Sequence, residues 1–160
     1  MIPPESWIPF FDWCEATFLG VLVRESIWMF PVIESVHLTA LCLMGGALIL
    51  VDLRLLGFGL HEVGLDDLER HVRPWLVAGV TVMLSTGVLL FLSEAIKCFY
   101  NTSFWVKMIT LPVALLFTFL VKERAIQGGL TTSTRSRVIA AASLALWFTV
   151  AAAGRWIGFS

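Results

Sequence analysis

The sequence predicts an all-α integral membrane protein, a four-helix bundle with an N-terminal interfacial helix. Of its 160 residues, 58% are hydrophobic and 14% are charged, and the mean hydropathy is +0.87. A soluble domain carries about 25% charged residues, so this chain has too few to cover a surface that faces water. A net charge of −1 also lacks the excess of positive charge that binding to nucleic acid requires. We therefore expect membrane lipid around the protein and no nucleic-acid partner.

Five segments make up the predicted fold, a single membrane domain over residues 1–160. An interfacial helix is expected at about 6–23, where aromatic residues alternate loosely with Asp12 and Glu15. Four spans follow at about 27–53, 70–97, 104–122 and 136–158, each long enough to cross roughly 30 Å of hydrocarbon. The loops between the spans are short, which makes neighbouring helices antiparallel.

The distribution of Lys and Arg predicts the orientation of the chain. Four of these residues lie on the side of the termini. Seven lie in the loops after the first and third spans: Arg54, Arg70, Arg73, Lys122, Arg124, Arg135 and Arg137. Because positive charge is retained on the cytoplasmic side, we expect both termini on the outer face.

Small residues predict where helices approach closely. Gly45 and Gly46 in the first span, and Gly79 and Gly87 in the second, allow two backbones to meet. A groove beside Gly45 and Gly46 that admits a flat ligand is the alternative interpretation.

Ionisable side chains inside hydrocarbon are candidates for a functional site, because each needs a partner there. Glu34 and His37 are three residues apart in the first span and are expected to share a helix face. A structural ion-pair network is the alternative, and snorkelling to the interface is favoured for Lys97 and Arg155. All four spans contribute to this outer level: Glu34, His37, Glu94, Lys97, Lys107 and Arg155.

Depth excludes a metal site built from two histidines. Arg54 lies 17 residues beyond His37, roughly 25 Å deeper along a helix, and His71 opens the second span at that inner level. A di-iron site needs further carboxylates, and only Glu94 is available near His37. A zinc site is not expected either, because the spans hold one buried histidine and no paired cysteines.

At the inner end, Asp52 is expected to pair with an arginine, either Arg54, Arg70 or Arg73. A site for an anionic lipid or a propionate, formed by these arginines, is the alternative. Among the cysteines, Cys14 and Cys98 share the outer side and are candidates for a disulfide, whereas Cys42 is expected to be a buried thiol.

Three runs carry a resemblance to known families: RESIWMFPVIESVHLTALCLMGGALILVDLRLLG, RHVRPWLVAGVTVMLSTGVLLF and NTSFWVKMITLPVALL. They resemble an uncharacterised family of small bacterial inner-membrane proteins, which implies a bacterial inner-membrane location with periplasmic termini. The layout is more distantly similar to HemJ-type protoporphyrinogen oxidases and CopD-like membrane proteins. The HemJ-type resemblance implies a b-type haem, with His37 as the axial ligand and Lys107 as its partner or second ligand. Asp52-Leu53 departs from the Pro of that family, which puts porphyrinogen oxidation in doubt.

Three functions are compatible with these features, and whether the protein is an enzyme stays open. The first is a haem b redox protein that exchanges electrons with quinone or a protein partner. The second is a non-enzymatic accessory subunit or small carrier, within a homo-oligomer or larger membrane complex, with its polar site in the outer half of the bundle. The third is purely structural. The residues expected to bind a cofactor are His37, Lys107, Glu34, Glu94 and Arg155, with His37 as the metal ligand.

Overall fold

A computed structural model describes residues 4–59, 62–129 and 133–159, and all its regular elements there are helical. In chain order they are η1 (Glu5–Trp7), α1 (Ile8–Glu15), α2 (Phe18–Glu25), α3 (Met29–Leu56), α4 (Leu65–Ser93), α5 (Ala95–Tyr100), α6 (Thr102–Leu116), the π-helical η2 (Phe117–Lys122), α7 (Glu123–Gln127) and α8 (Thr134–Ile157). The predicted all-α fold is therefore confirmed.

Four helices are long and apolar enough to cross a membrane: Met29–Leu56, Leu65–Ser93, Thr102–Gln127 and Thr134–Ile157. Each overlaps one predicted span. Many large apolar side chains on these helices point outward, among them Ile49 (48% exposed), Ile109 (71%) and Phe148 (76%). Such a surface is suited to lipid rather than water, which fits a multi-pass membrane protein.

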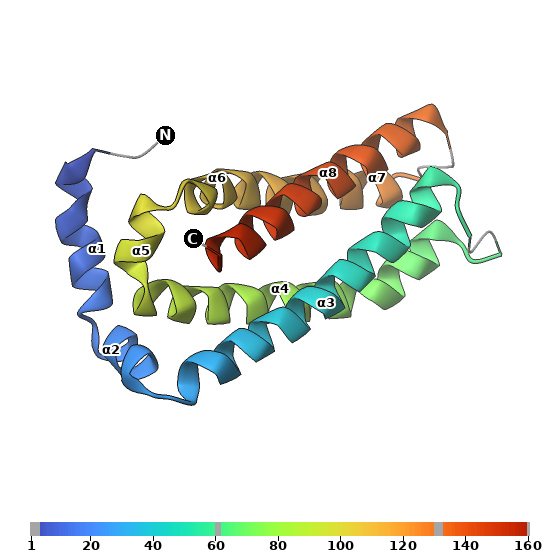
Figure 1. Cartoon of the computed structure of the whole chain (residues 1–160). Coiled ribbons are helices and arrows are strands. Elements are labelled where there is room, and N and C mark those ends of the chain that lie inside the picture. The colour runs from blue at the N-terminus through green and yellow to red at the C-terminus, as the bar shows by residue number, and fades with distance from the viewer. Residues whose placement is uncertain (1–3, 60–61, 130–132, 160) are drawn as a thin grey trace.

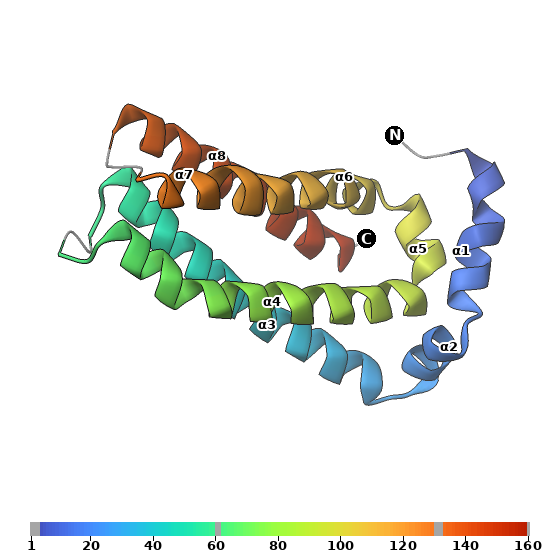
Figure 2. The ribbon, with the colours of Figure 1, turned by 180° about the vertical axis from the view of Figure 1, so that it is seen from behind.

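The long helices form two antiparallel pairs, α3 with α4 and α6 with α8 (Figure 1). The pairs meet at the end that holds α7 and diverge toward the end that holds α5 (Figure 2). An apolar cluster between the pairs forms the middle of the core: Met44, Leu48, Val80, Ala114, Trp147 and Val150. The cluster therefore separates two ends of the bundle: the diverging end near α5, which we call the outer level, and the end near α7.

The N-terminal segment is two helices rather than the single one expected at 6–23. The chain breaks after Glu15, and Thr17 starts α2 because its hydroxyl accepts a hydrogen bond from the Gly20 backbone N–H at 3.2 Å. Phe11 and Cys14 of α1 are buried in a cluster with α5. The segment thus packs across the diverging end of the bundle (Figure 1).

The second span ends earlier than expected. Helix α4 stops at Ser93, and Glu94 leaves helical geometry with φ −137° and ψ 40° before α5 begins. The Glu15 carboxylate of α1 accepts the backbone N–H of Ile96 at 2.9 Å, which satisfies a donor that a helix start leaves free. A contact from 81 residues away therefore stabilises the break.

Close packing at glycine was predicted in the first and second spans, and the structure shows it in the second. A Cβ at Gly79 would lie 2.8 Å from Met44 Cβ and 3.2 Å from the Ala40 carbonyl oxygen, so α3 and α4 touch there. Gly45 and Gly46 have nothing within 4 Å of an added Cβ. The expectation that these two residues form a packing face was wrong, since they border open space.

Candidate functional site

At the outer level, a hydrogen bond joins α3 and α4. His37 Nδ1 lies 2.8 Å from Thr86 Oγ1, and the Thr86 hydroxyl donates to the Val82 carbonyl at 2.7 Å. With that hydroxyl proton on the Val82 carbonyl, Thr86 Oγ1 is free to accept from Nδ1, which fits the imidazole tautomer that carries its proton on Nδ1. His37 Nε2 then keeps its lone pair, which is the form of histidine that binds a metal or a proton.

Two glycines lie beside the basic groups at this level. A Cβ at Gly87 of α4 would be 3.4 Å from His37 Cε1, and a Cβ at Gly154 of α8 would be 3.3 Å from Lys107 Nζ. Lys107 projects from α6 and interacts electrostatically with His37. His37 of α3 and Lys107 of α6 thus each lie beside a glycine of the neighbouring helix in their own pair, and we call these two side chains the basic pair.

The other three predicted cofactor residues lie elsewhere. Glu34 is exposed although it is only three residues from His37. Glu94 is in the break between α4 and α5, 3.9 Å from Lys97. Arg155 is exposed, with its guanidinium 4.3 Å from the centre of the Phe159 ring. Convergence at the outer level is therefore limited to His37 and Lys107.

At the other end of the bundle, the structure brings together a buried ion pair that the sequence analysis missed. Lys122 Nζ donates to Asp52 Oδ1 at 2.9 Å, and Ser143 Oγ donates to Asp52 Oδ2 at 2.7 Å. The side chain of Asp52 is 0% exposed and that of Lys122 is 5% exposed. Three helical elements, α3, η2 and α8, therefore hold this buried triad of Asp52, Lys122 and Ser143.

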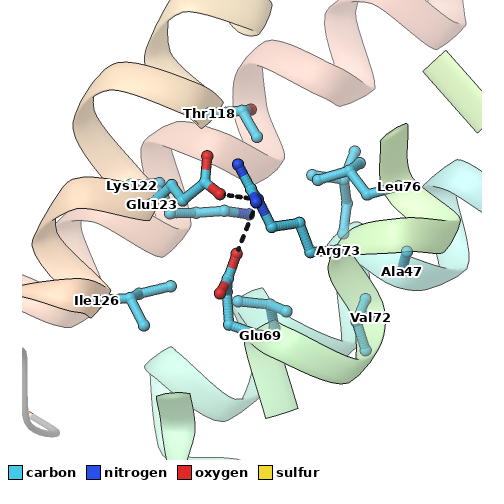
Figure 3. Close-up of a pocket in the computed structure, with 11 residues that line it drawn as sticks. Ala47, Glu69, Val72, Arg73, Leu76, Thr118, Lys122, Glu123 and Ile126 are labelled. Carbon is cyan, nitrogen blue, oxygen red and sulfur yellow. Dashed lines mark ion pairs between the residues drawn. The ribbon is translucent and has the colours of Figure 1, made fainter. Parts of the chain in front are cut away.

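The expected partners of Asp52 make other contacts. Arg54 donates to the Val63 carbonyl oxygen at 3.3 and 3.4 Å. Arg73 forms ion pairs with Glu123 of α7 and with Glu69 at 3.9 Å (Figure 3). The predicted pairing of Asp52 with an arginine was wrong because Lys122, expected at the end of its span, is turned into the bundle.

A small cavity connects these ion pairs. Its volume is about 20 Å³, and its lining includes Lys122, Thr118, Glu69, Arg73 and Glu123, which surround it in Figure 3. One water molecule needs roughly 10–15 Å³ of such space. The cavity therefore has room for a single water beside the buried triad.

The three cysteines are free thiols, and Cys42 is exposed, so its predicted burial was wrong. Cys14 and Cys98 are both buried in one cluster at the diverging end but are free thiols there, so the expected disulfide between them was wrong. Burial, assisted by the negative charge of Glu94, raises the pKa of Cys98 to about 11. Within residues 4–59, 62–129 and 133–159, no group of three or more His, Cys, Asp or Glu side chains is placed to hold a metal ion.

Comparison with known proteins gives one match. The model of a family described as "Family of unknown function (DUF6644)" matches residues 10–160. No curated protein and no solved structure matches the chain. An uncharacterised family was thus correctly predicted, while the similarity to HemJ-type and CopD-like proteins stays a prediction.

Proposed function

The chain belongs to DUF6644, a family of unknown function, and on this premise we propose that it is a multi-pass membrane protein that holds a b-type haem at His37. The haem would serve one-electron exchange with quinone or a protein partner. The bacterial inner membrane, the periplasmic termini and assembly into a homo-oligomer or larger complex belong to the same proposal. Lys122 is buried, so six of the seven positive residues behind that orientation are left to support it.

The hydrogen bond from His37 to Thr86 is the observation that carries the haem proposal. A histidine that ligates a metal donates its other ring N–H to an oxygen, and this fixes the tautomer and the ring orientation. His37 has this arrangement, with Thr86 as the acceptor. Gly87 keeps the α4 backbone close to the ring, so His37 is held between two helices.

Lys107 supplies the second element of the proposed site. No carboxylate within 4.0 Å pairs with it in the part of the chain that the structure describes. Lys107 is half-buried. A cation partly removed from water favours an anionic partner, and a haem carries two propionates. Lys107 would hold a propionate or serve as a second ligand, while Glu34, Glu94 and Arg155 would have no role at the iron.

The test is an absorption spectrum of the oxidised and dithionite-reduced protein, purified in mild detergent from haem-replete cells. We expect a Soret band and a sharp reduced α band, both lost in His37→Ala. His71→Ala is the matched control, because His71 is exposed and its Nδ1 bonds to the Asp67 carbonyl of its own helix at 2.7 Å. A colourless wild-type protein, or unchanged haem in His37→Ala, would exclude this function.

Variants of Thr86 test whether His37 is a ligand of the haem or only lies near it. Thr86→Val removes the acceptor and keeps the shape, so we expect weaker haem retention and a shifted reduction potential. Thr86→Ser keeps the hydroxyl and should restore both. Identical spectra and potentials in Thr86→Val would remove the tautomer argument.

A non-enzymatic membrane component is the second candidate, favoured by the charge of Lys107. A cation with no carboxylate within 4.0 Å among the described residues would suit an anionic group carried by a substrate or a partner subunit. In that case the protein is colourless, and an anionic ligand raises its melting temperature in wild type but not in Lys107→Met.

A further inference from the structure

The buried triad plays no part in the proposed haem site. Asp52 lies 15 residues beyond His37 on α3, about 22 Å along the helix. An ion pair shielded from solvent is weak evidence for stability, since apolar residues of similar size often serve as well. Its placement among apolar helices therefore needs another explanation.

A path leads from the surface to this triad. A groove of about 570 Å³ on the outside of α4 is lined by Asp66, Arg70 and Gln127, together with Glu69 and Arg73. The same Glu69 and Arg73 line the small cavity, whose far wall includes Lys122. Glu69 and Arg73 thus line both the groove and the cavity. Lys122 lies on the cavity beside them (Figure 3) and donates to Asp52.

The groups along the path are suited to passing protons. Glu69 and Glu123 both form ion pairs with the Arg73 guanidinium, which holds their two carboxyl groups close to each other. Two carboxyl groups that share a site hold one proton between them more readily than either does alone. The cavity beyond them has room for one water, which bridges groups too far apart for a direct bond.

We propose that this end of the bundle is a proton-entry site that serves Asp52. Lys122 Nζ gives a proton to Asp52 Oδ1 across their 2.9 Å hydrogen bond and takes one from the cavity water. That water is reprotonated by the Glu69–Glu123 pair, which refills from the groove. The net change is one proton moved from the groove to Asp52, with Lys122 and the water unchanged.

Protonation of Asp52 replaces the ion pair with a neutral acid beside a cation. Every element around Asp52 contributes a polar group whose contacts would change with this protonation. These groups are Glu69 and Arg73 from α4, Lys122 from η2, Glu123 from α7 and the uncharged Ser143 from α8. The buried triad is therefore a protonation switch between the two helix pairs.

Infrared spectroscopy of the whole protein in lipid nanodiscs tests the proposal. Lowering the pH should produce a carboxylic-acid C=O band that shifts with carboxyl-¹³C aspartate and is absent from Asp52→Asn. After transfer to D₂O, we expect this band to shift at least tenfold more slowly in Glu69→Gln/Glu123→Gln than in wild type. Glu94→Gln, at the opposite end of the bundle, is the control and should exchange at the wild-type rate.

A second variant keeps the test valid if the double glutamine variant does not fold. Ala47 lines the cavity and is 6% exposed, so Ala47→Val fills the cavity without removing a charge. The same slowing is expected there. The proposal is overturned if no Asp52 band appears at any pH at which the protein stays folded. It is also overturned if the exchange rate is unchanged in every folded variant of the path.

Discussion

Removing one partner of the Asp52–Lys122 pair should destabilise the protein more than removing both. With Lys122→Met, the fully buried Asp52 carboxylate keeps only the 2.7 Å hydrogen bond from Ser143. Breaking a buried pair in this way costs about 3–5 kcal/mol. For a chain of this size, 1 kcal/mol lowers the melting temperature by about 2–4 °C, so we expect a loss of roughly 6–20 °C. The double variant Asp52→Asn/Lys122→Met buries no charge and should stay within about 1–2 kcal/mol of wild type.

The assay is the melting temperature in mild detergent, measured as the loss of the monodisperse peak on size exclusion after heating. Lys97→Met is the matched control, because Lys97 lies 3.9 Å from Glu94 and its side chain is 43% exposed. An exposed pair contributes less than about 1 kcal/mol. Equal, small losses in Lys122→Met and Lys97→Met would refute the reasoning. A double variant as unstable as the sum of the single ones would also refute it, because contacting residues should not behave additively.

Two further predictions concern packing and thiol chemistry. Gly79→Ala should cost about 1–3 kcal/mol, since its methyl group would meet Met44 Cβ at 2.8 Å; Gly45→Ala, with nothing within 4 Å, should be neutral or stabilising, and equal melting temperatures would contradict this. Cys98, whose pKa is raised from 9.0 to about 11, should have about a hundredfold smaller thiolate fraction at pH 8 than an ordinary thiol. Its alkylation should accelerate about tenfold per pH unit until about pH 11. Mass analysis after timed iodoacetamide treatment measures this, and faster labelling of Cys98 than of exposed Cys42 would contradict it.

The long helices could be predicted from the sequence because a span is defined by local composition. Some 18 or more apolar residues in succession have few alternatives to a membrane helix. The breaks at residues 16–17 and at Glu94 depend on contacts between distant segments, such as the Glu15 carboxylate on Ile96 N–H. No local pattern contains such a contact, so one interfacial helix and an uninterrupted second span were expected.

The candidate site was predicted in part for a related reason. Helical spacing places Glu34 and His37 on one face, yet of these two only His37 is turned toward the other helices. The part of a helix face that is buried depends on the angle at which neighbouring helices cross, and the sequence does not give that angle. Lys122 was assigned to the cytoplasmic end of its span. The π-helical turn Phe117–Lys122 alters the register that a regular helix would give, and such turns are frequent at functional sites. The signal that pointed to this end of the bundle was Asp52, a lone carboxylate next to a long apolar run.

The position of the two sites at opposite ends of one packed core makes them independently testable. About 22 Å of α3 separates His37 from Asp52, and the cluster around Met44, Leu48 and Trp147 fills the space between the helix pairs. A proton that enters beside Lys122 has no continuous polar route through that cluster, so it cannot reach the basic pair by a simple relay. Variants at sites this far apart should add in their effects on stability. Loss of haem in His37→Ala should therefore leave the Asp52 carboxyl band and its exchange rate unchanged. A change in that rate would mean that the helix pairs move against each other, since the described side chains between the two ends form an apolar cluster.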